Sequence, residues 1–300
     1  MSTTQAVVVI GEVLFDQFDN GQSVLGGAPF NVAWHLQGFN QNPVFISRVG
    51  DDTYGEKIIK TMQDWGMRTN GVQLDTHYPT GKVKVSLNKG QPDFDICQDV
   101  AYDYIDLTQA DEALVDSNIP VLYHGSLVAR TQKVFDALLQ FRQAAEVSFV
   151  DINLRPPWWN ISSAMTLMQG ANWLKVNDDE LYQLTNCQDD LSEMILAARR
   201  LLTELMIDVL VLTRGSEGAV IVSEQDVHQS APVRVEHIVD TVGAGDAFSS
   251  VCILGMQQGW NKQDILQRAA EFAAQVCQQQ GATSSNHEMY QTLREKWQVR

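Results

Sequence analysis

Residues 240–248 read DTVGAGDAF, so two glycines and an alanine stand directly before an acid, Asp246. An apolar, helix-like run continues to residue 256. The pattern predicts a glycine-rich turn that opens a helix. Free backbone N–H groups and the positive end of the helix dipole then face whatever lies in the turn. Small residues also let a bulky anion approach the backbone closely.

The chemistry that this turn favours is proton abstraction beside a bound anion. Gly243, Ala244 and Gly245 would form the anion cradle, and Asp246 would accept a proton from an attacking hydroxyl. Phosphoryl transfer to an alcohol requires both in one place. A dinucleotide fingerprint would need a third glycine where Phe248 stands, and no G-x-x-x-x-G-K-[ST] loop occurs. A plain glycine turn with a capping acid is the other interpretation of this string.

Composition indicates a globular protein, with 44% hydrophobic and 19% charged residues among 300. The formal net charge of −16, without a block of basic residues, argues against nucleic acid or an anionic membrane as a partner. Such a protein would handle phosphates locally, with backbone N–H groups, a few Arg or Lys side chains and a divalent metal.

The cysteines and the N-terminus indicate a cytoplasmic protein. The chain has 4 cysteines, far apart and without a C-x-x-C pair, which is typical of reduced thiols rather than of a zinc site. The N-terminus lacks a charged segment followed by a long apolar run, and no apolar stretch reaches the roughly 18 residues of a membrane span. We therefore expect a soluble protein.

Strands and helices alternate along the chain. Short apolar, β-branched runs predict buried strands at 6–10, 43–49, 121–126, 148–153, 173–177 and 208–213. Helical patterns lie between or after them, at 55–65, 131–145 and 264–277. This alternation predicts one α/β domain over residues 1–300, with a doubly wound, mostly parallel sheet.

One region departs from that pattern. Residues 82–88 alternate polar and apolar side chains, which predicts a half-exposed antiparallel strand or hairpin. A hairpin that leaves an α/β body suggests a lid, and we expect small-sheet lid segments at approximately 12–26 and 80–106. Phe94, Tyr102 and Tyr104 would pack over a ligand, form the lid core or make a subunit contact. The exposed strand edge also suggests a homodimer paired lid to lid.

Candidate ligand-binding residues follow predicted strand ends, where ligands collect in open α/β sheets. Asp16 follows the first strand, and Arg155 follows the strand at 148–153. Asn31 lies in the first turn of a helix that Gly26 and Gly27 precede. Each has a structural alternative: a surface turn acid for Asp16, helix capping for Asn31 and a salt bridge for Arg155.

Two further motifs also have alternative interpretations. Asn177 and Glu180 are three residues apart at a predicted helix start, which fits either a capping pair or the orientation of water around Mg²⁺. Thr213, Gly215 and Gly218 end one strand and precede the next, which fits either the lining of a nucleotide site or a β-hairpin turn.

Taken together, these motifs resemble the ribokinase-like sugar kinases, the PfkB carbohydrate kinase family. The G-G-x-x-x-N at Gly26, Gly27 and Asn31 and the D-T-x-G-A-G-D-x-F at 240–248 match its two signatures in order. The likeness covers nearly the whole chain. The stretches GGAPFNVA (26–33), FISRVGDD (45–52) and DINLRPPW (151–158) look like bacterial fructokinases.

The resemblance implies ATP-dependent phosphorylation of a sugar hydroxymethyl group, with Asp246 as the base and residues 243–245 around the transferring phosphoryl group. It assigns the sugar to Asp16, Gly27, Asn31 and Arg155, to which we add Gly26 of the same glycine pair and Tyr102 of the expected lid. It assigns ATP to Asn177, Thr213, Gly215, Gly218, Gly243 and Gly245, and Mg²⁺, through water, to Asn177 and Glu180. A K⁺-like cation would lie near main-chain oxygens of Asp240, Val242, Gly281 and Ser285. Arg214, where the family more often has an apolar residue, and the glutamines at 278–280 depart from the family pattern.

Three functions therefore compete. The first is a fructokinase, which converts D-fructose and ATP to fructose 6-phosphate and ADP. The second is a related kinase for a riboside, ribose or a keto-deoxy sugar acid. The third is a catalytically silent sugar- or nucleotide-binding regulator, against which the retained Asp246 argues.

Overall fold

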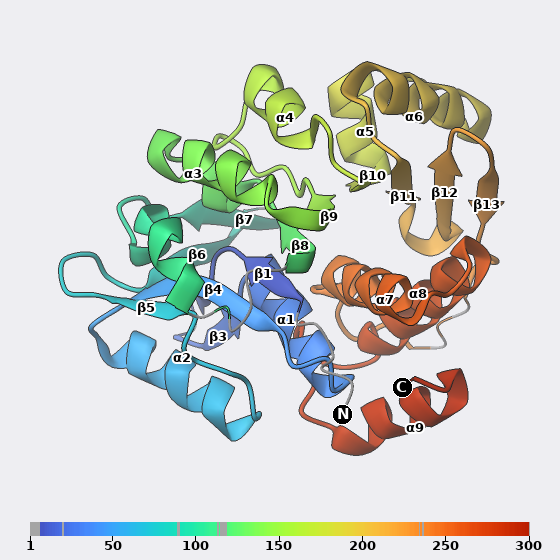
Figure 1. The fold of residues 1–300 in the computed structure, drawn as a ribbon. Helices are drawn as coiled ribbons and strands as arrows, with labels where there is room; N and C mark the ends of the chain where they lie inside the picture. The colour runs from blue at the N-terminus through green and yellow to red at the C-terminus, as the bar shows by residue number, and fades with distance from the viewer. Residues whose placement is uncertain are drawn as a thin grey trace.

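A computed structural model describes residues 7–19, 21–88, 91–112, 114, 119–233, 235 and 237–299. Its main feature is a nine-stranded sheet of order β13-β12-β11-β10-β9-β8-β1-β4-β5 (Figure 1). The strands are β1 (Val8–Ile10), β4 (Val44–Gly50), β5 (Val72–Asp75), β8 (Ile119–His124), β9 (Ala145–Asp151), β10 (Trp173–Asn177), β11 (Val209–Thr213), β12 (Ala219–Ser223) and β13 (Val227–Gln229). All neighbours from β11 to β5 are parallel, and β12 and β13 add antiparallel pairs. The predicted doubly wound, mostly parallel sheet is confirmed.

Helices cover both faces of this sheet (Figure 1). They are α1 (Ala28–Gly38), α2 (Thr53–Asp64), α3 (Gln132–Arg142), α4 (Ile161–Met168), α5 (Asp178–Thr185), α6 (Leu191–Leu205), α7 (Ala244–Gln258), α8 (Lys262–Val276) and α9 (His287–Trp297). Successive β1 residues point to opposite faces, so Val8 and Ile10 join one core and Val9 joins the other. Burial on both faces explains why the strand sequences are continuously apolar.

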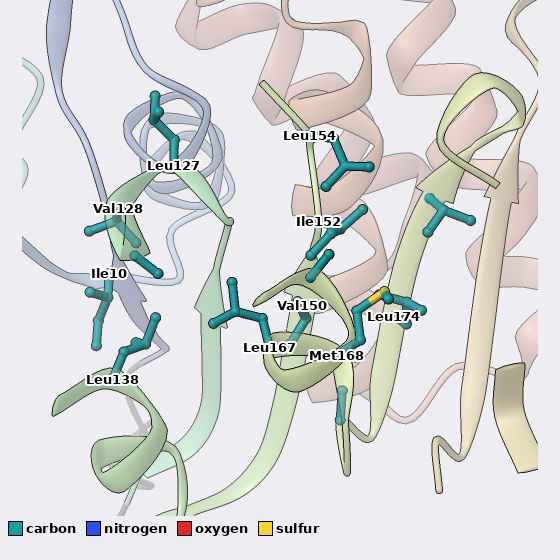
Figure 2. Close-up of a cluster of buried hydrophobic side chains, with 14 of the residues drawn as sticks. Ile10, Leu127, Val128, Leu138, Val150, Ile152, Leu154, Leu167, Met168 and Leu174 are labelled. Carbon is teal, nitrogen blue, oxygen red and sulfur yellow. The ribbon is translucent and has the colours of Figure 1, made fainter. Parts of the chain in front are cut away.

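The first core lies under α3 to α6. Figure 2 shows Ile10, Val150 and Leu174 of three strands packed with Leu138 of α3 and Met168 of α4. The second core lies under α1, α2, α7, α8 and α9. Because α1 and α7 pack on the same face, the two glycine turns that open them come to the same edge of the sheet.

A smaller sheet of order β3-β2-β6-β7 stands beside the large one. Its strands are β2 (Leu14–Phe18), β3 (Ser23–Gly26), β6 (Gly81–Asn88) and β7 (Gln91–Ile96), which fall within the two expected lid segments. β6 and β7 form the predicted antiparallel hairpin. The side chains of residues 85–94 are outside the description, and so is the expectation for Phe94.

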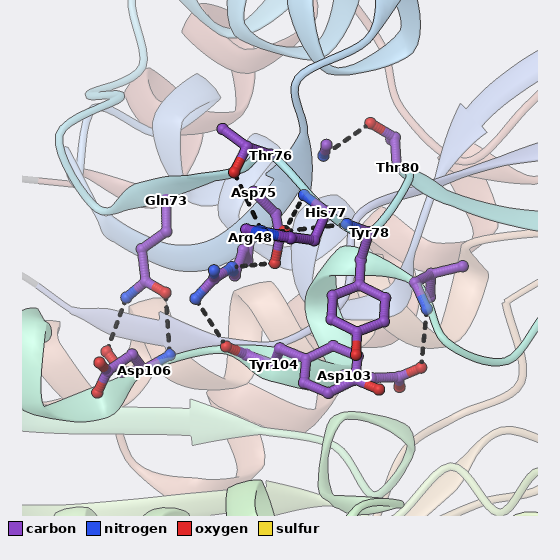
Figure 3. A network of polar contacts seen from close by, with 12 residues as sticks. Arg48, Gln73, Asp75, Thr76, His77, Tyr78, Thr80, Asp103, Tyr104 and Asp106 are labelled. Carbon is purple, nitrogen blue, oxygen red and sulfur yellow. Dashed lines mark hydrogen bonds and ion pairs between the residues drawn. The ribbon is translucent and has the colours of Figure 1, made fainter.

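Polar contacts attach the base of the small sheet to the body. Figure 3 shows Asp75, the last residue of β5, at their centre. Its carboxylate pairs with Arg48 at 2.7 Å and accepts hydrogen bonds from the backbone N–H groups of His77 and Tyr78. Thr80, just before β6, donates its hydroxyl to Asp52 at 2.8 Å. These contacts fasten the start of β6 to the body.

The sequence pattern placed one helix boundary wrongly and left out the helices α4, α6 and α9. The helix expected at 131–145 ends at Arg142, and Ala145 already begins β9. Alanine fits either element, so the local pattern did not mark this change. The helix α9 packs Tyr290 and Trp297 into the second core without having been expected. Within the described residues, every helix is too short or too polar to cross a membrane.

Candidate active site

The start of α7 has the geometry that its glycines predicted. Gly243 is the N-cap residue, with a φ of 81°, in the left-handed region that favours glycine. A β-carbon at this position would lie 2.3 Å from the β-carbon of Ala282. Within the described residues, the backbone N–H groups of Gly245 and Asp246 have no hydrogen-bond acceptor. These N–H groups and the helix dipole make the turn suitable for an anion.

Asp246 meets Asn31 at this turn. The Nδ2 of Asn31 donates to the Oδ2 of Asp246 at 2.7 Å, across 215 residues of sequence. Asn31 therefore does not act as a helix cap, and its Oδ1 is buried without a partner among the described residues. Burial raises the pKa of Asp246 to about 6, with Asp151 adding to the rise, whereas the hydrogen bond from Asn31 and the charges of Lys175 and Arg155 oppose it. The carboxyl group is thus mostly ionised at pH 7 and still basic enough to take a proton.

Asp16 and Arg155 approach the same place from other elements. Asp16 lies on β2 of the small sheet rather than in a surface turn, and burial raises its pKa to about 6, opposed by Arg155. A β-carbon on Gly26 would lie 3.2 Å from the Oδ2 of Asp16. Arg155 is exposed and forms no ion pair within the described part of the chain, yet its charge lowers the pKa of both Asp16 and Asp246. The guanidinium therefore faces two carboxyl groups without being neutralised by contact with either.

Glu12 is a residue that the sequence pattern did not single out. It is 3% exposed, two residues after β1, and its Oε2 has no partner among the described residues. Burial raises its pKa to about 7, Arg155 lowers it and Asp246 raises it. Gly27, with a φ of 114°, packs so closely that a β-carbon would lie 2.5 Å from the carbonyl oxygen of Glu12. The sequence signal that could have identified Glu12 is an acid two residues after a buried strand.

Tyr102 is packed between the body and the base of the small sheet. Its side chain is fully buried, and the guanidinium of Arg130 lies 5.0 Å from its ring centre. A β-carbon on Gly81, the first residue of β6, would lie 2.6 Å from the ring. The ring of Tyr104 instead stacks on the ring of Tyr78, with 3.8 Å between the two ring centres, in the network of Figure 3. The role of Tyr102 in sugar binding stays a prediction.

Asn177 and Glu180 form a reciprocal cap at the start of α5. The backbone N–H of Glu180 donates to Asn177 Oδ1 at 2.7 Å, and that of Asn177 donates to Glu180 Oε2 at 2.9 Å. The other oxygen of Glu180 accepts the N–H of Leu154 at 2.8 Å. Burial raises the pKa of this carboxyl group. Both of its oxygens are engaged by backbone, so a role toward Mg²⁺ through water stays a prediction.

The proposed nucleotide side is built by the turn between β11 and β12. Thr213 ends β11, and Gly218 has a φ of 89° where the chain reverses into antiparallel β12. Gly215 lies in the same turn, in which Arg214 pairs with Glu217. This turn has the predicted hairpin geometry. Its contact with a nucleotide stays a prediction.

The predicted monovalent-cation residues lie on two segments that Asp240 joins. Its carboxylate accepts the N–H of Val242 at 3.0 Å and the N–H of Gly281 at 3.1 Å. Ser285 is exposed at the end of the second segment. The described residues contain no cluster of three or more His, Cys, Asp or Glu suited to a metal ion. Any cation here would depend on main-chain oxygens, water or a ligand.

A buried ion pair behind the turn was also not anticipated. Lys175 of β10 lies 2.9 Å from Asp151 at the end of β9, and both are almost fully buried. The hydroxyl of Ser249 in α7 donates to the same carboxylate at 2.7 Å. A lysine inside the apolar strand at 173–177 was the signal in the sequence.

These residues bring the buried carboxyl group of Asp246, the backbone N–H groups of the helix start and the charge of Arg155 to one edge of the sheet. The pfkB family carbohydrate kinase model matches residues 6–289, nearly the whole chain. The chain belongs to the pfkB family of carbohydrate kinases. In this pfkB member, the two glycine turns meet in space at Asn31 and Asp246.

Known relatives of this pfkB chain include kinases for different sugars. It is 28% identical to the fructokinase of Escherichia coli over 270 residues, which are 83% of this chain and 84% of that protein. It is 25% identical to the ribokinase of Arabidopsis thaliana over 273 residues, 88% of this chain and 70% of that protein. The crystal structure of a fructokinase from Vibrio cholerae O395, with fructose, ADP and calcium bound, matches with a TM-score of 0.79 at 22% identity, over 97% of this chain and 99% of that one.

Proposed function

We propose that this pfkB sugar kinase is a fructokinase, which transfers the terminal phosphoryl group of ATP to a hydroxymethyl group of D-fructose. The observation that carries the proposal is the 2.7 Å contact between Asn31 and Asp246, which sets a base beside the open helix start. The fructokinase relative and the fructokinase-like stretches of sequence support the choice of sugar.

In the proposed mechanism, Asp246 takes the proton from the sugar hydroxyl as that oxygen attacks phosphorus. Asn31 orients the carboxylate through its amide N–H. The glycine turn at 243–245 holds the oxygens of the transferring group, with the backbone N–H groups of Gly245 and Asp246 as donors, since charge on these oxygens is stabilised by fixed donors at a helix N-terminus. Asp16 and Arg155 hold the other end of the sugar by hydrogen bonds.

A divalent cation belongs to this proposal because the chain has a net charge of −16 and few cations at the site. Mg²⁺ would be held mainly by the ATP phosphates and water, with Asn177 and Glu180 orienting that water, and it would offset the triphosphate charge. K⁺ binding near Asp240 and Gly281, a cytoplasmic location and a homodimer paired through the edges of the small sheet are further parts of the proposal.

The test is ADP production from Mg·ATP with fructose, ribose, a keto-deoxy gluconate or a riboside, each with and without K⁺. We expect a strong preference for fructose. Preference for another sugar would keep the mechanism and reject the substrate, and the ribokinase relative makes ribose the first alternative. No turnover with any of them would favour the binding regulator.

A further inference from the structure

A buried ion pair lies directly behind the glycine turn of α7. The Nζ of Lys175 is 2.9 and 3.0 Å from the two carboxylate oxygens of Asp151, and the side chains are 8% and 2% exposed. They come from β10 and β9, neighbouring strands of the large sheet. Desolvation of two buried charges commonly cancels their attraction, so an apolar pair would serve stability about as well. Stability alone therefore does not account for these two residues.

The ion pair touches the first turn of α7 at two points. A β-carbon on Gly245 would lie 3.4 Å from the Nζ of Lys175, so the ammonium lies against the second glycine of the anion turn. Ser249, one turn further along α7, donates its hydroxyl to Asp151 at 2.7 Å, and that hydroxyl is 3.0 Å from the carbonyl oxygen of Gly245. Tyr123 of β8 donates to the same carboxylate oxygen at 3.3 Å. The sheet thus holds the helix start through Asp151.

We propose that Lys175 and Asp151 are positioning residues for the phosphoryl transfer. They fix the glycine turn against the sheet. They also place one positive and one negative charge near Asp246, so that their effects on the basicity of its carboxyl group oppose each other. This inference rests on the proposed function. Neither residue contacts the sugar in this proposal, and both act through the turn and through Asp246.

The charged groups around Asp246 support this opposition between Lys175 and Asp151. Asp151 raises the pKa of Asp246, and Lys175 lowers it, while burial accounts for most of the rise to about 6. Other groups also face Asp246. Arg155 and the Asn31 amide lower its pKa, and the Glu12 carboxyl and the Tyr123 hydroxyl are electrostatically coupled to it. Removing one member of the pair should therefore shift the basicity of Asp246 in a direction set by the charge that remains.

The experiment measures kcat/KM for the sugar against pH at saturating Mg·ATP, in the wild type and in Asp151→Asn, Lys175→Met and the double variant. The acid limb of each profile is the rise in kcat/KM with pH that follows deprotonation of Asp246. We expect this limb to move to lower pH in Asp151→Asn and to higher pH in Lys175→Met, each by on the order of one pH unit. The double variant should return close to the wild-type position, because it removes both charges. Titration of ATP contributes equally to all four profiles.

A structural role alone predicts a different result. It would lower the melting temperature and the amount of active enzyme without moving the acid limb. Asp75→Asn is the matched control, because Asp75 pairs with Arg48 at 2.7 Å and is 1% exposed but lies in the network of Figure 3, away from α7. It should destabilise the protein and leave the limb in place.

Single-variant profiles that coincide with the wild type, or that move to the same side of it, would overturn the inference and leave the proposed function intact. Asp151→Asn decides alone if Lys175→Met does not fold, because the asparagine keeps the shape of the side chain and its Oδ1 can still accept from the Lys175 ammonium. A wild-type protein silent on every sugar would overturn the proposed function, and this inference with it.

Discussion

The carboxyl group of Asp246 is the residue-scale feature with the clearest energetic consequence. Its pKa is about 6 in the folded protein against an ordinary value of 3.8, because burial disfavours its charged form. Well below pH 3.8 the group is protonated whether the chain is folded or not. As the pH rises from 4 through 6, the unfolded chain loses this proton more readily, so the group progressively disfavours folding. Above pH 6 that cost is constant.

Asp246→Asn should therefore separate activity from stability. We expect kcat to fall about 10²–10⁴-fold because the base is lost, while sugar binding remains. At pH 8 the free energy of unfolding should rise by about 3 kcal/mol, with little gain at pH 4, where the native carboxyl is already neutral. Steady-state kinetics and urea unfolding at both pH values check this. A variant with near-wild-type kcat would remove Asp246 from its proposed role.

A second residue-scale prediction concerns His35 in α1. Burial lowers its pKa to about 4, so the ring is neutral at pH 7. Its Nε2 lies 2.9 Å from the carbonyl oxygen of Ala282 and must carry the proton there, which leaves Nδ1 to accept the hydroxyl of Tyr290 at 2.8 Å. Tyr290→Phe should cost about 1–2 kcal/mol of unfolding free energy, because a buried acceptor loses its donor. Tyr182→Phe, at a side chain 56% exposed, is the control in the same urea titration and should cost almost nothing.

At the scale of elements, the start of α7 depends unequally on its two glycines. Gly243 has a positive φ and no room for a β-carbon beside Ala282, whereas a β-carbon on Gly245 would make only an ordinary contact with Lys175. Gly243→Ala should thus destabilise the fold by at least about 1–2 kcal/mol from backbone strain alone. Gly245→Ala should leave the free energy of unfolding within about 0.5 kcal/mol of the wild-type value. Equal melting temperatures for the two variants would contradict this account.

At the scale of the whole molecule, the proposed sugar site joins two sheets. Asp16 lies on β2 of the small sheet, and Asp246 lies on α7 against the large one. A sugar held by both should oppose any opening that separates them. At 100 times Kd this adds about 2.7 kcal/mol, which slows exchange through such openings roughly 100-fold. We expect fructose to protect the amides of β2 and β6 in hydrogen exchange, with α6 unchanged as an internal reference. Unprotected β2 amides under saturating sugar would contradict a bridging site.

Much of the fold was accessible from local patterns. Continuous apolar runs predicted the central strands, because strands buried on both faces of a parallel sheet cannot alternate with polar residues. The glycine turns before α1 and α7 were recognisable, because few residues other than glycine adopt the conformation of Gly243 or tolerate the close packing at Gly27. The helices α4, α6 and α9 were not expected, and their apolar side chains are understood only against the cores that they cover.

The sequence by itself determined the central strands, the two glycine turns and the acid at position 246, since each depends on neighbouring residues and on the backbone conformations that they allow. Only the tertiary structure decided that Asn31 donates a hydrogen bond to Asp246, that Asp16 belongs to the small sheet, and that Lys175 meets Asp151 behind the turn. It also decided that Glu12 and Asp246 hold their protons to unusually high pH. Contacts and pKa shifts of this kind arise from burial and from charges that approach through space, which the spacing of residues along a chain does not specify.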